Sequence, residues 1–246
     1  MAWAALLYIF VNGMHSAVSV ANVFSGSPSP PPARTTIAVC CYKEPDNLLE
    51  ASLSSLANQD IVKLYPQMFE LMMVTSGGCS EGLAQLYGFK VVRAPRGKLV
   101  SRDMATRLAS GEIIVSADAD TYYPLGWLSK VLEPFRDSSV VGVTVPSIEG
   151  SAPLRELFFG LWKHVVYSNK MLGRGSAYRK WAYFSAGGFN LDVDRLYLES
   201  RDTDLLVQEE EIGFKKRLEK IGRVVYVNAP VIHMGSPSDR GLHSQS

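Results

Sequence analysis

Two aspartates one residue apart follow an apolar stretch in the segment IIVSADADTYYP, which runs from Ile113 to Pro124. Asp118 and Asp120 point to the same side of an extended chain, where two carboxylates repel each other unless a positive charge lies between them. Hard divalent cations such as Mg²⁺ and Mn²⁺ prefer such oxygen ligands and commonly bridge to substrate phosphates. The pair therefore predicts a metal site, while a turn capped by Asp120 remains the alternative explanation.

Three consecutive glutamates, Glu209, Glu210 and Glu211, open the last helical pattern of the chain. Acidic residues at a helix N-terminus complement the helix dipole, which is the simpler explanation, but three exceed that need. Glu211 shares a helical face with Phe214 and Leu218, and we expect it to point toward the domain interior. A carboxylate directed inward beside a metal site indicates a general base.

His233 and a group of basic residues are further candidates. A lone histidine is more often structural than a ligand, so that only proximity to the two aspartates would make His233 a metal ligand. The basic residues either form a solvated face or neutralise a diphosphate. They are Arg93, Arg96, Lys98 and Arg102, and they lie just before the strand that ends at Asp118 and Asp120.

Short apolar runs alternate with helical patterns from Thr35 onward, and these elements must position the candidates. The runs expected to form strands are residues 35–42, 70–74, 89–93, 112–117, 140–146, 223–228 and 231–233. The helical patterns cover residues 46–59, 100–110, 124–136, 153–172 and 209–222. This alternation predicts an α/β fold with a mostly parallel central sheet flanked by helices. Ligands bind outside the carboxyl ends of such strands, so the loops Tyr42–Pro45, Thr75–Gly78 and Asp118–Asp120 are expected to share one edge.

The N-terminal region differs in composition from the rest of the 246 residues. Ala2–Phe24 is uncharged and long enough to cross a bilayer as an apolar helix, although a polar stripe also fits a helix lying on a surface. A Ser/Pro-rich linker completes residues 1–33, one domain is expected over residues 34–234, and residues 235–246 are expected to form a flexible tail. Basic residues follow the apolar run but do not precede it, which favours membrane association with a cytoplasmic catalytic domain.

Charge and cysteine content limit the partners and the compartment. The net charge is +1 and the basic residues are dispersed, so a nucleic acid is not an expected partner. Cys40, Cys41 and Cys79 lack metal-ligand spacing, and the first two point to opposite faces of a strand. We expect three core cysteines in a reducing compartment and no disulfide. The chain contains neither G-x-G-x-x-G nor G-x-x-x-x-G-K-S/T, which excludes dinucleotide and P-loop sites.

Five stretches, in this order, resemble family 2 glycosyltransferases of the GT-A fold. They are TIAVCCYKEPDNLLEASLSSLANQ, VTSGGCSEG, RGKLVSRDMATRLASGEIIVSADADTYYPLGWL, GRGSAYRKWAYFSAGGF and EEEIGFKKRLEKIGRVVYV. The resemblance covers about residues 35–234 and implies a GT-A fold with a nucleotide-binding half and an acceptor half. It also implies inverting transfer of a sugar from a nucleotide-diphosphate donor to a hydroxyl of a glycan, lipid or protein, with Mn²⁺ or Mg²⁺ as cofactor.

The resemblance implies a role for each site residue. Asp120 would bind the metal, Asp118 would contact the ribose or the water shell of the metal, and His233 would add a metal or phosphate contact. Glu210 and Glu211 match the acidic pair that supplies the catalytic base, and Glu211 is our choice. The residues implied around the donor are Tyr42, Lys43, Glu44, Arg96, Lys98 and Arg102. Those implied near the transferred sugar and the acceptor are Gly175, Ser176 and Ala177.

The chain also departs from the family pattern. Thr75, Ser76 and Gly77 stand where many members carry aspartate, so Ser76 is the donor-binding candidate there and a uracil nucleotide is not implied. No Q-x-x-R-W follows the acidic pair, which argues against a processive polymer synthase. A sugar-phosphate nucleotidyltransferase is an alternative enzyme, but it would need a Gly-rich basic signature after the first strand, and CCYKEPDN does not supply one. A degenerate nucleotide-sugar or glycan-binding protein without turnover remains the non-enzyme alternative.

Overall fold

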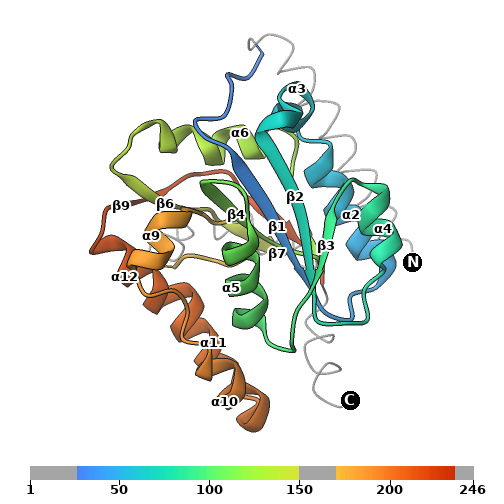
Figure 1. Cartoon of the computed structure of the whole chain (residues 1–246), viewed down its shortest axis with the longest axis vertical. Helices are drawn as coiled ribbons and strands as arrows, with labels where there is room; N and C mark the ends of the chain where they lie inside the picture. The colour runs from blue at the N-terminus through green and yellow to red at the C-terminus, as the bar shows by residue number, and fades with distance from the viewer. Residues whose placement is uncertain (1–26, 150–169, 236–246) are drawn as a thin grey trace.

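A seven-stranded sheet forms the centre of the computed structural model, which describes residues 27–149 and 170–235 (Figure 1). In spatial order its strands are β3 (Lys90–Arg93), β2 (Phe69–Thr75), β1 (Thr35–Cys41), β4 (Ile113–Asp118), β8 (Ala177–Arg179), β6 (Val140–Thr144) and β9 (Arg223–Tyr226). Only β8 runs antiparallel to its neighbours among these strands; the other pairings are parallel. The predicted α/β class with a mostly parallel sheet is confirmed.

Helices cover both faces of this sheet, which explains why the central strands are apolar on both sides. One face packs against α2 (Asp46–Ala57), α3 (Asp60–Leu64), α4 (Glu81–Leu86) and α6 (Trp127–Leu132). The other face packs against α5 (Lys98–Leu108), α9 (Lys180–Ser185) and α12 (Phe214–Glu219). Short 3₁₀ turns, η1 (Pro66–Met68) and η2 (Glu133–Arg136), connect some of these elements.

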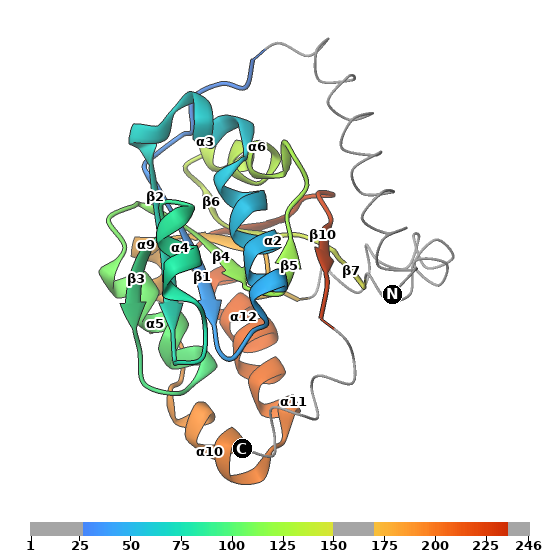
Figure 2. The same ribbon diagram turned by 90° about the vertical axis from the view of Figure 1, so that its right-hand side faces the viewer.

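A second, three-stranded sheet lies beside α2, as Figure 2 shows. It consists of β5 (Thr121–Tyr122), β10 (Val231–His233) and β7 (Ser147–Glu149), with β10 in the middle. The antiparallel pairing of β10 with β5 sets His233 opposite Thr121. The end of β10, the last strand among the described residues, is thereby brought to the segment that follows the two aspartates.

The second half of the chain contains α10 (Asp192–Ser200), α11 (Thr203–Leu206) and a π-helix, η3 (Val207–Gly213), that continues into α12 (Figure 1). The sequence predicted one regular helix over residues 209–222, and this part of the prediction is wrong. A π-helix bonds residue i to i+5, so the 3.6-residue spacing used to assign faces does not hold across it. In consequence Glu210 has the fully buried side chain, 3% exposed, and Glu211 is 13% exposed.

Several predicted segments lie outside the described residues. They are the apolar helix of residues 2–24, almost all of the helix expected over residues 153–172, and the tail from residue 236 onward. Within residues 27–149 and 170–235, no helix combines the length and apolarity that crossing a bilayer requires. The end of the Ser/Pro-rich linker contacts the domain, because Tyr65 donates a hydrogen bond to the carbonyl of Pro28 and Arg136 donates one to that of Pro30.

Candidate functional site

The three loops expected to share one edge of the sheet do so. β1 pairs in parallel with β2 and with β4, and the register places Cys41 opposite Thr75 and Cys40 opposite Asp118. The carboxyl ends of these strands therefore meet, and the loops that follow them lie together. This edge carries the residues predicted to contact a donor.

Asp120 and His233 form a hydrogen-bonded pair at this edge. Asp120 Oδ2 lies 2.9 Å from His233 Nε2, and the pairing of β10 with β5 holds the two residues together. Met234 N donates to the carbonyl of Asp120 at 2.8 Å, which fixes the backbone on the same strand pair. The proximity that would make His233 a ligand candidate is thus present.

The donor set of this pair fits a divalent cation. A carboxylate oxygen and an imidazole nitrogen can both bind Mn²⁺ or Mg²⁺, and their 2.9 Å hydrogen bond keeps the two side chains close enough to bind one ion in its place. Among the described residues, no cluster of three or more His, Cys, Asp or Glu side chains could enclose an ion. Mg²⁺-type sites commonly use one or two protein ligands and take the others from water and substrate phosphates.

Asp118 belongs to a different group of charges. Its Oδ1 accepts a hydrogen bond from Arg102 Nη2 at 2.5 Å, and Arg102 Nη1 donates to Ser116 Oγ at 2.6 Å. Arg102 Nε forms an ion pair with Glu210 Oε1, and Lys98 Nζ lies 3.0 Å from Glu210 Oε2. Two cations thus face two carboxylates, and the end of β4 is linked to the π-helix.

Electrostatics keeps Asp118 and Arg102 ionised. Burial acts to raise the pKa of the Asp118 carboxyl, but attraction by Arg102, Lys98 and Arg174 outweighs burial and holds that pKa well below its usual range. For Arg102, burial acts to lower the pKa, and the carboxylates of Asp118 and Glu210 raise it well above its ordinary value. Asp118 and Arg102 are therefore both charged at neutral pH.

Each glutamate of the acidic run has its own basic partner. Glu209 Oε1 lies 2.6 Å from Arg217 Nη2. Glu211 Oε2 lies 3.3 Å from Lys170 Nζ, and the carbonyl of Glu211 accepts a hydrogen bond from Met171 N at 2.8 Å. Since Glu209 also bonds to the backbone of Asn190, it is occupied structurally. The cation beside Glu211, Lys170, is partly exposed.

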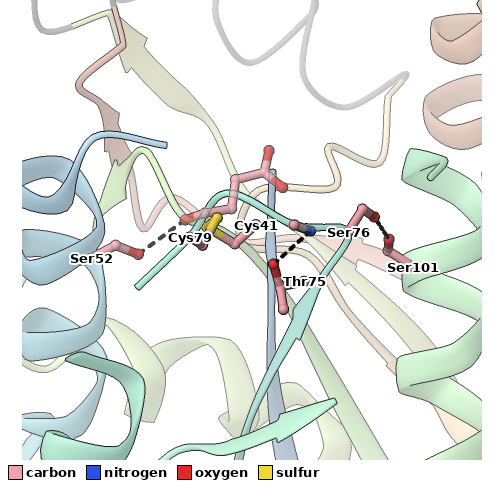
Figure 3. The surroundings of a disulfide bond; sticks show 8 residues. Cys41, Ser52, Thr75, Ser76, Cys79 and Ser101 are labelled. Atoms are coloured by element: carbon pink, nitrogen blue, oxygen red, sulfur yellow. Dashed lines mark hydrogen bonds between the residues drawn. A yellow bond between two sulfur atoms is a disulfide. The ribbon is translucent and has the colours of Figure 1, made fainter. Parts of the chain in front are cut away.

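A disulfide joins Cys41 and Cys79 at the loops that follow β1 and β2, residues 42–45 and 76–80, which we call the donor loops (Figure 3). It links the last residue of β1 to the loop between β2 and α4, across a sequence separation of 38 residues. The expectation of three reduced core cysteines is wrong for this pair, and Cys40 alone is a free thiol. Cysteine spacing does not show which strand ends meet, whereas the pairing of β1 with β2 brings Cys41 close to the loop that contains Cys79.

Backbone bonds extend this link between the two donor loops. Ser76 N donates to the carbonyl of Cys41, and Lys43 N donates to that of Gly77, both at 3.1 Å. Lys43 has a φ of 54° and Gly78 a φ of 76°. A Cβ on Gly78 would lie 2.7 Å from Lys43 Cγ, so this close approach requires glycine.

The loop between β3 and α5, residues 94–97, contacts both donor loops. The guanidinium carbon of Arg96 lies 5.1 Å from the ring centroid of Tyr42, an arrangement that favours a cation–π interaction. The Ser76 hydroxyl donates to the carbonyl oxygen of Pro95 at 3.2 Å. It also lies 3.0 Å from Ser101 Oγ (Figure 3). Glu44 is half-buried in the same region. The donor-side residues predicted from the sequence are thus brought together, with Arg96 exposed and Ser76 directed toward α5.

Gly175, Ser176 and Ala177 lie beside the end of β4. Gly175 N donates to the carbonyl of Ser116 at 2.7 Å, and Ser116 N donates to that of Ser176 at 2.8 Å. The Ser176 hydroxyl is buried and finds no hydrogen-bond partner within the described part of the chain. The segment predicted on the acceptor side therefore lies beside Ser116, which precedes Asp118 by two residues on β4.

Sequence reasoning missed three residues that shape this site. Ser116 lies two residues before Asp118, and strand alternation would have placed both on one face. The Tyr123 hydroxyl accepts a hydrogen bond from Asp118 N at 2.9 Å and donates one to the carbonyl of Asp118 at 3.4 Å. Lys170 pairs with Glu211, and no spacing signal indicated it.

Comparison with known proteins identifies a family. The model of a family described as "Glycosyl transferase family 2" matches residues 36–183. A search of curated protein sequences finds no match to the chain.

Several solved structures share the fold. The mannosyltransferase PcManGT from Pyrobaculum calidifontis, in complex with GDP-Man and Mn²⁺, has a TM-score of 0.65 at 19% identity, over 98% of this chain and 69% of that one. GalNAc-T7 with UDP, GalNAc and Mn²⁺ has a TM-score of 0.61 at 14% identity, over 82% of this chain and 44% of that one. Glucosyl-3-phosphoglycerate synthase from Mycobacterium tuberculosis, with Mn²⁺, UDP and glucosyl-3-phosphoglycerate, has a TM-score of 0.54 at 17% identity, over 87% and 76%. At these identities the likeness establishes the fold.

Proposed function

The chain belongs to glycosyl transferase family 2, and on that premise we propose that it is a metal-dependent inverting enzyme that moves a sugar from a nucleotide-diphosphate donor to an acceptor hydroxyl. One observation carries this proposal. Arg102 contacts both Asp118 and Glu210, which are 92 positions apart in the sequence. The carboxyl end of β4 and the π-helix Val207–Gly213, which we call the acidic segment, therefore lie at one site. Sugar transfer requires groups at both ends of the displacement, and this arrangement provides them together.

On the donor side, Tyr42, Lys43, Glu44 and Ser76 would surround the nucleoside. Arg96 and Lys98 carry positive charge beside them and would attract the diphosphate. Asp118 is ionised and would accept hydrogen bonds from the ribose or from the water shell of a cation. These roles follow from the family pattern and from the positions of the residues at the carboxyl edge of the sheet.

Asp120 and His233 would hold the Mn²⁺ or Mg²⁺ ion. When bound, such an ion stabilises the negative charge that develops on the departing diphosphate. The support is the fit of the donor atoms described above, together with the Mn²⁺ present in the structures of PcManGT and GalNAc-T7.

Glu211 would act as the general base. Its carboxylate would accept the proton of the acceptor hydroxyl as that oxygen attacks the anomeric carbon, and the diphosphate would leave from the opposite side. One such displacement inverts the configuration and needs no covalent nucleophile. Glu210 is less suited to this step because both of its carboxylate oxygens are already paired with buried or partly buried cations.

Nucleotide release tests this function directly. The full chain is incubated with a panel of UDP- and GDP-sugars and with glycan, lipid-linked and protein acceptors, in MnCl₂ or in EDTA. We expect Mn²⁺-dependent release from one donor, lost in Asp120→Ala and Glu211→Gln and kept in the matched control Asp137→Asn. Binding of UDP or GDP without turnover across the whole panel would instead support the nucleotide-sugar-binding alternative.

Membrane association through residues 2–24 and a cytoplasmic catalytic domain stay predictions. Partitioning of the full chain and of a chain lacking residues 2–24 between membrane and soluble fractions tests the first. The Cys41–Cys79 disulfide bears on the second, since structural disulfides persist mainly in oxidising compartments. Protease accessibility of the domain in sealed membrane vesicles would decide its side.

A further inference from the structure

Arg102 is more deeply buried than a residue that contacts the donor needs to be. Its side chain is 2% exposed, whereas that of Lys98, one turn earlier on α5, is 37% exposed. Three nitrogens of its guanidinium are directed at Ser116, Asp118 and Glu210. All three contacts are to other residues of the protein. They therefore do not explain the role of donor contact that the sequence predicts for Arg102.

The rigid shape of the guanidinium makes these three contacts interdependent. Its nitrogens are coplanar, so the positions of Ser116, Asp118 and Glu210 are set relative to one another. Ser116 and Asp118 belong to β4, which is central in the sheet, while Glu210 belongs to the π-helix. Because β4 is held on both sides by neighbouring strands, its contacts with Arg102 fix the guanidinium, and the guanidinium in turn fixes Glu210.

α5 is itself held firmly at the end nearest this contact. Asp194 of α10 accepts hydrogen bonds from Leu99 N at 3.2 Å and Val100 N at 2.8 Å, which caps the helix. Gly97 has a φ of 150°, and a Cβ on it would collide with the Asp194 carboxylate. The helix that carries Arg102 thus has little freedom to shift.

Glu211 follows Glu210 directly in the π-helix, so its backbone position depends on the same contact. π-Helical segments are uncommon and occur frequently at functional sites, where they need support from their surroundings. The carbonyl of Glu211 is fixed on the other side by Met171 N. Glu210 with Arg102 and Met171 with Glu211 therefore hold the segment from two directions.

We propose that Arg102 is a positioning residue that aligns the base-carrying segment, Val207–Gly213, with the donor-binding end of β4, and that it does not contact the donor. This inference rests on the proposed function for the role of Glu211. The structural part, that Arg102 orders Val207–Gly213, can be measured without any turnover.

Arg102→Lys is the first test, because lysine keeps the charge but cannot make three coplanar contacts. Hydrogen exchange of residues 207–213 is expected to accelerate at least tenfold, while the Kd for UDP or GDP with MnCl₂ changes less than threefold. With any donor that the panel yields, kcat is expected to fall about 100-fold at a nearly constant donor KM, as misplacement of a reacting group predicts.

Two other variants separate positioning from general loss of stability. Gly173→Ala leaves all charges in place but inserts a methyl group against Glu210 and Arg102, so it is expected to accelerate exchange in the same segment. Arg96→Ala removes an exposed basic side chain at the donor loops and is expected to raise the nucleotide Kd without changing that exchange.

Two results would overturn the inference. A rise of tenfold or more in nucleotide Kd for Arg102→Lys, with unchanged exchange of residues 207–213, would make Arg102 a donor contact. Uniformly faster exchange across all strands would make it a general stabilising residue. If no donor turns over but the exchange and Kd results hold, the positioning role stands and the proposed function fails.

Discussion

His233 Nε2 lies 2.9 Å from Asp120 Oδ2 across 113 residues of sequence. The contact depends on the small sheet, because β10 pairs with β5 immediately after the Asp118–Asp120 turn. The proximity to Asp120 on which the sequence-based role of His233 as a metal ligand depended is thereby present. The pair is also accessible in part, since the Asp120 side chain is 23% exposed.

Replacing His233 tests this pair as a metal site. In His233→Ala, the Mn²⁺ concentration that gives half-maximal UDP or GDP binding is expected to rise ~10–100-fold, because one ligand or orienting partner is lost. Calorimetric titration of MnCl₂ at fixed nucleotide measures this value. Asp120→Asn should lose Mn²⁺-dependent binding altogether, and Asp137→Asn serves as the control. Unchanged Mn²⁺ dependence in both site variants would refute the assignment.

The glutamates of the acidic run should separate chemistry from stability. Glu211→Gln is expected to lower kcat about 10²–10⁴-fold with little effect on unfolding, because it removes the proton acceptor. Glu210→Gln leaves buried Arg102 and partly exposed Lys98 without a full counter-charge and is expected to cost about 3–5 kcal/mol in unfolding free energy. Turnover assays and urea denaturation of both variants measure the two effects. The reverse pattern would move the base to Glu210.

Much of this site follows from local sequence patterns. The apolar runs around Val39, Val74 and Val115 predicted buried parallel strands, and the parallel arrangement alone gathers their carboxyl ends at one edge. That is why the donor loops and the Asp118–Asp120 turn were placed together correctly. Each of these inferences needs only residues close in sequence.

The parts that sequence did not predict depend on contacts between distant elements. The π-helix replaces the regular helix, and buried Glu210 is paired with Arg102 and Lys98 at its centre. The π-helix makes Glu210 the most deeply buried glutamate of the three, whereas the regular spacing predicted that Glu211 points inward. The disulfide between Cys41 and Cys79 depends on the geometry of two loops, which no spacing rule describes.

The Cys41–Cys79 disulfide should support both stability and nucleotide binding. Closing a loop of 38 residues is expected to stabilise the fold by about 2–4 kcal/mol. Cys79→Ser should lose this stability, and it should also weaken UDP or GDP binding because the loops that follow β1 and β2 lose their covalent link. Urea denaturation and nucleotide titration with and without reductant measure both. Wild-type nucleotide affinity in Cys79→Ser would limit the disulfide to a stabilising role.

Cys40 should make the stability of the fold depend on alkaline pH. Burial raises the pKa of its thiol to about 11 from an ordinary value of 9.0, so the folded chain keeps a proton that the unfolded chain releases between these values. The stability that this proton contributes is complete below pH 9 and is lost as the pH rises toward 11. Urea denaturation at intervals from pH 8 to 11 should therefore show a steeper loss for the wild type than for Cys40→Ser, which has no thiol to titrate there. Parallel pH profiles for the two proteins would contradict a raised pKa at Cys40.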